Sequence, residues 1–168
     1  MIDESEIRKA ISILKPDGEL FEVRVMYSSK QMYSGYFKSA DDLITALNRD
    51  VREYAKCNMY ITLNALNEAC YSRDQSNRFI KNIKITTSDN DVEGYEYLFI
   101  DIDPSRPTGT SSSDEQVAKA KETGNKVFSF MKNIGFNDPV FGFSGNGVHL
   151  LYRVELKNTE DRRELIKK

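Results

Sequence analysis

The chain has 168 residues, of which 39% are hydrophobic and 30% charged, a composition that is typical of one folded domain and excludes a disordered chain. Apolar runs stay well short of the roughly 20 residues that span a bilayer, and the acidic start lacks the apolar stretch of a signal peptide. The net charge of −2 argues against a protein that coats nucleic acid by bulk charge. These features predict a single cytoplasmic domain over residues 1–168 with no membrane partner.

The first third of the sequence predicts a mixture of helices and strands. Its expected elements, in chain order, are a helix at 3–14, strands at 21–27 and 31–37 joined by a turn at 28–30, a helix opened by Ser39 whose inner face includes Tyr54, and a strand at 59–63. Apolar residues three and four apart indicate the helices, and the spacing of Asp3 and Glu6 is that of a capping box. The strands are rich in β-branched and aromatic residues.

Residues 66 to 92 predict a mostly irregular connection with one short strand, because polar residues dominate and only Ile80, Ile83 and Ile85 suggest an apolar pattern. A loop of this length is uncommon inside a compact domain and is often functional. Its basic residues predict either a solvated loop face or a local basic groove. They are Arg73, Arg78, Lys81 and Lys84.

The last third has the clearest pattern. Its expected elements are a strand at 95–103, a loop at 104–109, a helix from Ser112 or Ser113 to Asn133, a strand at 139–143, a turn at 144–147, a strand at 148–154 and a helix that begins at Asp161. Gly135 follows the long helix where a helix end is expected, and Asn-Gly is a strong hairpin signal. The order of these elements predicts an α+β fold, with helices covering a sheet that contains antiparallel strands.

The cysteine and histidine content limits the metal chemistry. Cys57 and Cys70 form no C-x-x-C pair, and His149 is the only histidine of the chain. Structural zinc sites need about four Cys or His ligands. The sequence therefore predicts no zinc site and two ordinary reduced thiols.

Asp101 and Asp103 give the strongest catalytic signal. They end an apolar strand on which Leu98, Ile100 and Ile102 suit a core, and because residues two apart on a strand share a face, both carboxylates point the same way. Such a pair repels itself unless a cation is bound, and Mg²⁺ and Mn²⁺ commonly take one or two carboxylates plus substrate phosphates. The pattern predicts a Mg²⁺ or Mn²⁺ site; the alternative is two ordinary aspartates at a solvated strand end.

A glycine-rich turn supplies a second candidate motif, Ser144-Gly145-Asn146-Gly147-Val148-His149. Glycines let a backbone approach a ligand closely, and exposed N–H groups in such a turn can bind phosphate oxygens. As a phosphate ligand, His149 would donate a hydrogen bond and could also be protonated, and the Ser144 hydroxyl would donate a hydrogen bond to the same phosphates. A structural histidine is the competing interpretation.

The two motifs together resemble the archaeo-eukaryotic primase superfamily, in particular its phage- and plasmid-type primase–polymerase branch. D-I-D-P-S-R-P-T-G at 101–109 is followed by a long helix and then by S-G-N-G-V-H-L-L-Y at 144–152, and M-Y-I-T-L-N at 59–64 resembles a strand upstream of the metal motif in that branch. The resemblance covers about residues 35 to 155.

The resemblance implies an RRM-like catalytic sheet packed with an N-terminal α/β unit, and a metal-dependent DNA primase or polymerase for phage, plasmid or mobile-element replication. It implies a DNA template and primer and nucleoside triphosphates as substrates, and a helicase domain or protein as a partner. The implied catalytic residues are Asp101, Asp103 and His149, with Asp101 and Asp103 as metal ligands, and the implied nucleotide-binding residues are Ser144, Gly145, Asn146, Gly147, His149 and Arg106.

One feature departs from the family pattern. The family has a third acidic metal ligand on a later strand, and Glu155, Glu160 and Asp161 do not lie in a suitable strand context. We expect this ligand beyond Lys168, so the chain by itself would bind nucleotide weakly or be inactive.

Two other functions remain open on the sequence alone. A haloacid-dehalogenase-type phosphatase also places D-x-D after an apolar strand, with Ser144 in the place of a later serine, but it leaves the glycine turn and His149 unexplained. A non-catalytic RRM-like module would bind nucleic acid by stacking bases on exposed Tyr97 and Phe99.

Overall fold

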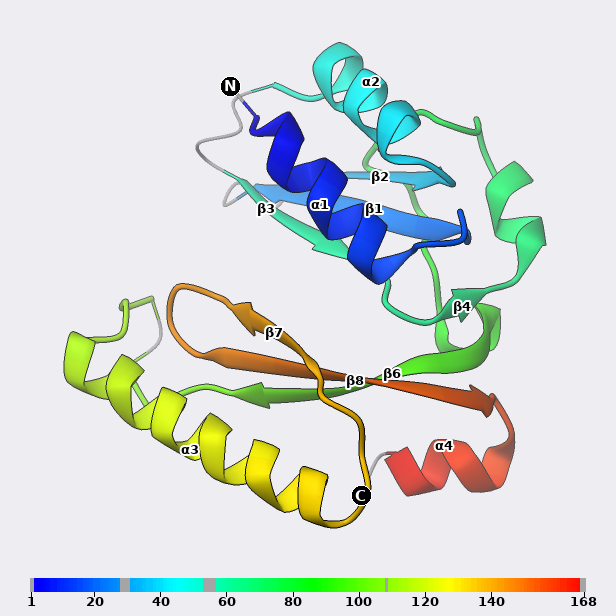
Figure 1. Ribbon diagram of the computed structural model, residues 1–168. Coiled ribbons are helices and arrows are strands. Elements are labelled where there is room, and N and C mark those ends of the chain that lie inside the picture. The colour runs from blue at the N-terminus through cyan, green and yellow to red at the C-terminus, as the bar shows by residue number, and fades with distance from the viewer. Residues whose placement is uncertain (1, 28–30, 53–56, 108, 167–168) are drawn as a thin grey trace. The chain divides into compact units, whose positions relative to one another are not determined.

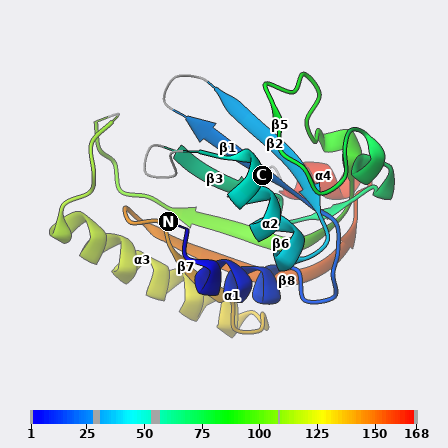
Figure 2. The same cartoon turned by 90° about the horizontal axis from the view of Figure 1, so that it is seen from above.

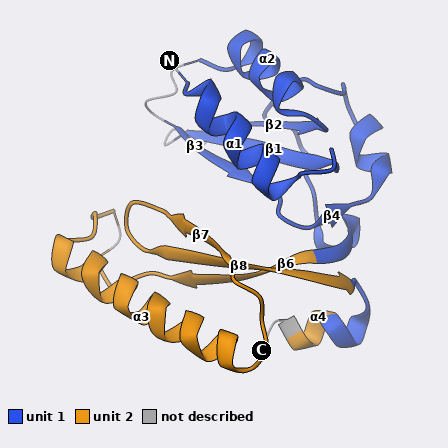
Figure 3. Cartoon of the chain, in the orientation of Figure 1, with its two compact units in different colours: residues 1–95, 157–162 blue, residues 96–156, 163–168 orange. Residues whose placement is uncertain are grey.

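The computed structural model describes residues 2–27, 31–52, 57–107 and 109–166. The chain has an α+β fold with antiparallel sheets, as expected, and two compact units (Figure 3). Unit 1 contains Met1–Tyr95 and Lys157–Arg162, and unit 2 contains Glu96–Leu156 and Arg163–Lys168. The expectation of one domain over 1–168 stays a prediction. Tyr54 and the expected turn at 28–30 lie outside the described residues.

Unit 1 is built on an antiparallel sheet with strand order β3-β1-β2-β5, with β1 between β2 and β3 (Figure 2). Its elements are α1 (Glu4–Leu14), β1 (Phe21–Tyr27), β2 (Met32–Phe37), α2 (Ala40–Asp50), β3 (Cys57–Ile61) and β5 (Ile80–Lys81). Helices α1 and α2 lie on the same side of this sheet (Figure 1). Asp3 and Ser39 cap the two helices, since their side chains accept hydrogen bonds from the N–H groups of Glu6 and Asp42.

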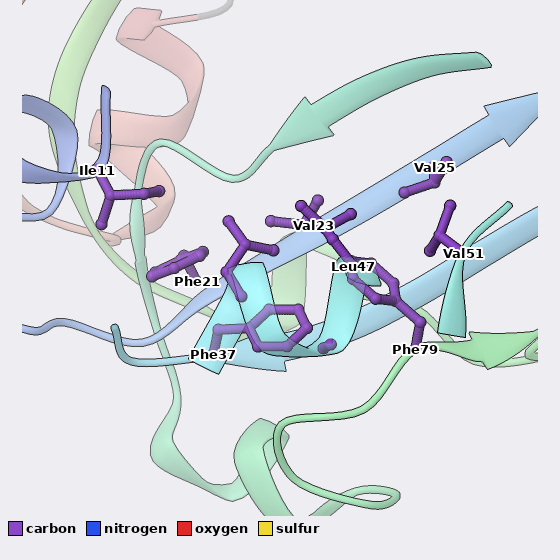
Figure 4. Close-up of a cluster of buried hydrophobic side chains, with 10 residues drawn as sticks. Ile11, Phe21, Val23, Val25, Phe37, Leu47, Val51 and Phe79 are labelled. Carbon is purple, nitrogen blue, oxygen red and sulfur yellow. The ribbon is translucent and has the colours of Figure 1, made fainter. Parts of the chain in front are cut away.

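The apolar core of unit 1 fills the space between the helices and β1 and β2 (Figure 4). Val23 and Val25 alternate along β1 and are almost fully buried, because one face of the strand is turned toward the helices. Phe37 from β2 packs on Phe79, with ring centroids 5.0 Å apart, and Leu47 completes the layer from α2. The predicted amphipathic patterns therefore account for this core.

The segment between β3 and β6 (Val92–Ile102) is irregular with short ordered pieces, as predicted. It contains β4 (Ala65–Leu66), the 3-10 helices η2 (Glu68–Ser72) and η3 (Asp89–Asp91), and β5. β4 pairs with the first residues of β6. Strand β6 begins at Val92 rather than near Tyr95, because this pairing with β4 extends it.

Unit 2 has three neighbouring strands in the order β6-β8-β7, with β6 and β8 running in opposite directions and α3 along one face (Figure 1). Its further elements are α3 (Asp114–Asn133), β7 (Val140–Phe143) and β8 (Val148–Lys157), and α4 (Glu160–Ile166) follows. Ser113 and Gln116 form the capping box that starts α3. None of the described helices has the length and apolar character needed to cross a membrane.

The inner face of the unit 2 sheet is apolar. Leu150 and Tyr152 from β8 are buried with Met131 from α3. Leu98, Ile100 and Ile102 of β6 pack against the same cluster, which confirms the face expected for them. Asp101, which lies between Ile100 and Ile102 on the strand, is thereby left on the opposite face.

Tyr97 is an exception to the sequence-based expectations. It was expected to offer an exposed ring for base stacking, but only 4% of it is exposed. Its hydroxyl accepts a hydrogen bond from Arg153 Nη1 at 3.1 Å, and the Arg153 guanidinium lies 5.4 Å from the ring centroid. The prediction was wrong for Tyr97, because strand alternation identifies a face without saying which of its residues are covered. Phe99, on the same face, is 45% exposed as expected.

Candidate functional site

Asp101 is the next-to-last residue of β6, on the face of the sheet turned away from α3, and Asp103 directly follows the strand. About half of the Asp101 side chain is exposed, and 42% of the Asp103 side chain. Their oxygens are therefore open to a ligand, unlike the apolar side chains of β6 that pack toward α3. Accessible carboxylates are the donors that Mg²⁺ or Mn²⁺ takes together with substrate phosphates.

His149 lies beside the first aspartate. Its Nε2 is 3.3 Å from Asp101 Oδ1, and the ring meets Phe99 edge-on with centroids 4.9 Å apart. On the other side, Gly142 of β7 is the cross-strand partner of His149, and a Cβ at Gly142 would come within 3.1 Å of the histidine Cβ. Phe99 and Gly142 thus fix the ring between them. Sequence reasoning did not assign Gly142 or Phe99 to the site, since neither belongs to a motif.

Gly147 lies against the second aspartate. A Cβ at Gly147 would overlap Asp103 Oδ1 and the Ile102 carbonyl oxygen, so only glycine permits this approach. Gly147 and His149 are two residues apart and contact Asp103 and Asp101 respectively. The structure therefore brings the two motifs together across the neighbouring strands β6 and β8.

Hydrogen bonds within the protein hold the glycine turn in shape. Ser144 Oγ accepts from the N–H of Gly147 at 2.9 Å and from that of Asn146 at 3.3 Å. Gly145 has a φ of +87°, a conformation that glycine adopts readily. Asn146 Oδ1 accepts from the Ser112 N–H at 2.9 Å and so ties the turn to the loop before α3. In the described structure, Ser144 and Asn146 shape the turn; their expected contact with nucleotide stays a prediction.

Arg106 pairs with the second aspartate. Its Nη1 lies 3.0 Å from Asp103 Oδ2 and also donates to the Pro104 carbonyl, while its Nε donates to the Thr110 carbonyl. The guanidinium is mostly covered, with 19% of the side chain exposed. Arg106 therefore both folds the loop and offsets one of the two neighbouring negative charges. The sequence indicated a basic residue here but not its partner.

A depression of about 410 Å³ adjoins Asp103 on the side of α3. Its walls are the loop residues Pro104 and Ser105 and the first turns of α3, including Gln116 and Lys119. Gln116 Nε2 donates to the Ser105 carbonyl at 3.2 Å, which links the loop to the helix. The volume lies within the roughly 300–1,000 Å³ of small-ligand sites. This depression could not be predicted from the sequence, because its lining is brought together from a loop and a helix that share no motif.

The remaining candidates are the expected third metal ligand and the cysteine and basic residues of unit 1. Among the residues that the structure describes, no three or more His, Cys, Asp or Glu side chains gather as a metal site. This holds for Asp101, Asp103 and His149 taken together, and for any third carboxylate beside the two aspartates within that part. Cys70 is a buried thiol and Cys57 a partly buried one. Of the four basic residues in the connection, Arg73 pairs with Asp91 and Arg78 with Asp50.

Comparison with known proteins identifies no family. No protein-family model, curated protein or solved structure matches the chain. The geometry of the site therefore carries the functional argument.

Proposed function

We propose that the chain is the catalytic part of a metal-dependent nucleotidyl transferase of the primase–polymerase kind. The observation that carries the proposal is the convergence of two motifs: Asp101 lies 3.3 Å from His149, and Asp103 abuts Gly147. The element order from β6 to α4 is strand, helix, strand, strand, helix, which corresponds to the start of a split β-α-β sheet. This order supports an RRM-like catalytic sheet.

The site residues take distinct roles in the proposed reaction. A primer 3′-hydroxyl oxygen attacks the α-phosphorus of a nucleoside triphosphate, the hydroxyl proton passes to solvent water, and the bond between the α-phosphorus and the pyrophosphate oxygen breaks, so that pyrophosphate leaves. Bound Mg²⁺ or Mn²⁺ would activate the hydroxyl and offset charge on the leaving pyrophosphate, and Asp101 and Asp103 would hold it. His149 donates a hydrogen bond to the triphosphate from beside Asp101.

The position of Arg106 has a consequence for this proposal. Because Arg106 pairs with Asp103 Oδ2, a bound cation and the guanidinium would compete for the same carboxylate. If a cation took the place of Arg106 at Asp103, the guanidinium would be able to donate hydrogen bonds to a triphosphate instead. Arg106→Gln would then weaken nucleotide binding more than cation binding.

Primer extension by the natural full-length polypeptide tests the proposal. With Mn²⁺ or Mg²⁺ and deoxynucleoside triphosphates, we expect extension of a primed DNA template and at least a 1,000-fold loss, about 4 kcal/mol of barrier, in Asp101→Asn. Glu155→Gln is the matched control, since Glu155 is an exposed carboxylate on neighbouring β8. Full activity in Asp101→Asn would refute the metal assignment.

A non-catalytic nucleic-acid-binding module is the second candidate, and exposed Phe99 favours it. The two open carboxylates beside Phe99 argue against it, because they repel a phosphate backbone unless a cation is bound. Binding of DNA that is unaffected by chelators, together with no extension, would favour this alternative. For a phosphatase, a covalent phosphate on Asp101 would be the diagnostic result.

A further inference from the structure

Unit 1 contains a polar cavity of about 240 Å³ on the face of its sheet opposite the helix-packed core. Its walls are formed by β1, by the last two residues of β3 together with the residue that follows them, and by the segment that leads into the start of β6. Its lining residues are Glu22, Arg24, Tyr60, Ile61, Thr62, Thr87, Ser88, Asp89 and Val92. All of them belong to unit 1.

Arg24 and Tyr60 form one wall of this cavity. They are direct cross-strand partners on β1 and β3, so their side chains stand together on one face. Tyr60 is 54% exposed and Arg24 keeps 31% of its side chain exposed. Arg24 Nη2 donates to Glu22 and to the Thr87 carbonyl, both at 2.8 Å. Among the described residues, the buried Arg24 Nε has no hydrogen-bond partner, so the guanidinium keeps an unused donor in the wall that it forms beside an exposed aromatic ring.

Glu22 holds the Arg24 guanidinium in place through an ion pair. Its carboxylate is fully buried and accepts hydrogen bonds from Ser34 Oγ, Arg24 Nη2 and the Thr87 N–H. A buried ion pair of this kind rarely improves stability over apolar residues of the same volume. Its presence is therefore better explained by the fixed position that it gives the guanidinium.

The charges of the lining decide which ligands fit. Glu22 already neutralises Arg24, and Asp89 adds an exposed carboxylate at the rim. With two carboxylates and one guanidinium, the lining has a net negative charge and disfavours a phosphate group. An uncharged ligand with both acceptors and donors suits it: acceptors face Arg24, and amine or amide donors face Asp89.

We infer that this cavity binds one unpaired nucleobase of a nucleic-acid strand, stacked on Tyr60 and hydrogen-bonded to Arg24 and Asp89. Unpaired bases are recognised by stacking on aromatic rings and by hydrogen bonds to their edges. The cavity is smaller than the roughly 300–1,000 Å³ of drug-sized ligand sites, which suits a single base. The choice of a strand as the source of the base depends on the proposed function; a free nucleoside offers the same chemistry.

Binding measured with the full chain in the presence of a chelator tests this inference without requiring catalysis. The probes are a fluorescein-labelled single-stranded DNA of twelve nucleotides, the same strand with abasic sites, and adenosine. We expect Tyr60→Ala to weaken binding of the intact strand about tenfold, the loss of one base stack, and to leave the abasic strand unaffected. Tyr60→Phe keeps the stack and stays within about twofold of the parent.

Phe130→Ala is the matched control, because Phe130 is an exposed aromatic residue of α3, with 61% of it exposed, outside the cavity. Equal weakening of intact and abasic strands by Tyr60→Ala, or no weakening of either, would overturn the inference. Adenosine binding that depends on Tyr60 supports the cavity with a free nucleoside as its ligand. Strand binding that depends on Tyr60, in a protein that shows no primer extension, would contradict the proposed function alone.

Discussion

Units 1 and 2 both carry clusters of charged side chains, but the two clusters are held in different ways. In unit 1, the Glu22 carboxylate is fully buried and accepts three hydrogen bonds, and Arg73 pairs with Asp91 through both terminal nitrogens. In unit 2, Asp101 is half exposed, and His149 Nε2 lies 3.3 Å from its Oδ1. A carboxylate with all its acceptor positions filled stabilises the fold, whereas an open one is available to a ligand.

The hydrogen bonds to the carboxylates of unit 1 also lower the pKa values of these groups. Burial raises the pKa of Glu22, but hydrogen bonds from Arg24, Ser34 and Thr87 outweigh it and leave the pKa below its ordinary value. Hydrogen bonds from Arg73 hold the pKa of Asp91 far below its usual range. These shifts stabilise the folded state at neutral pH. Glu22 and Asp91 therefore have a structural role in unit 1.

The largest expected effect on stability is in Glu22→Gln. This change leaves Arg24 partly buried without its counter-charge, so we expect a loss of about 3 kcal/mol in the free energy of unfolding. Urea denaturation measures it. Glu68→Gln, which removes an exposed partner of Lys38, should cost less than about 1 kcal/mol. Similar losses for the two variants would show that the buried Glu22 carboxylate contributes no more to stability than an exposed one.

Gly147→Ala tests the contact between the two motifs. The added methyl group would overlap Asp103 Oδ1 and the Ile102 carbonyl, so we expect about 2 kcal/mol of destabilisation. We also expect the variant to lose primer extension at temperatures where it is still folded. Gly135→Ala also strains a positive φ but meets no atom within 4 Å, and should leave extension unchanged at temperatures where it is folded. Wild-type extension in Gly147→Ala would show that the turn does not need to approach Asp103.

Asp50 gives a pH-dependent prediction within unit 1. Hydrogen bonds from Arg49 come first among the causes that lower its pKa from 3.8 to about 2, with further bonds from the Phe79 N–H and Arg78. Because the folded pKa is depressed, the stabilisation is present above the ordinary pKa and is lost as the pH falls toward 2. We expect the free energy of unfolding to fall by about 1–2 kcal/mol over this interval. The loss is kept this small because both arginines are partly exposed and solvent weakens their interaction with Asp50. Asp50→Asn should lose this part of the acid dependence, and an unchanged pH profile would contradict the assignment.

Asn146→Ala is expected to have the smallest effect. It removes the acceptor of the Ser112 N–H, which costs about 1 kcal/mol. A misplaced turn should raise KM for nucleoside triphosphate several-fold with little change in kcat. Asn146→Asp keeps an acceptor and should restore stability. If Asn146→Ala lowers kcat alone, Asn146 acts on the reaction itself and not through the turn.

The helices and strands of the fold could be predicted from the sequence because their signals are local. Asp3, Ser39 and Ser113 mark the helix starts by caps that the structure contains. Alternation along β6 predicted the inner face of Ile100 and, with it, the opposite face for Asp101. Each of these patterns depends on residues a few positions apart.

The parts that could not be predicted depend on contacts between distant segments. The bond between Ser112 and Asn146 joins residues 34 positions apart. The cavity of unit 1 draws Arg24 and Asp89 from segments with no common motif. No periodicity in one segment reports what another segment places beside it. The same limit explains the burial of Tyr97.

Binding of Mn²⁺ with and without a nucleoside triphosphate tests the central claim most directly, because it needs neither primer nor turnover. Titration calorimetry on the wild-type protein, Asp101→Asn, Asp103→Asn and Glu155→Gln would provide the comparison. We predict that each aspartate variant binds Mn²⁺ at least tenfold more weakly in the presence of the triphosphate, as expected for the loss of a metal ligand, while Glu155→Gln binds as the wild type does. Unchanged Mn²⁺ affinity in both aspartate variants would contradict the assignment of Asp101 and Asp103 as the metal site.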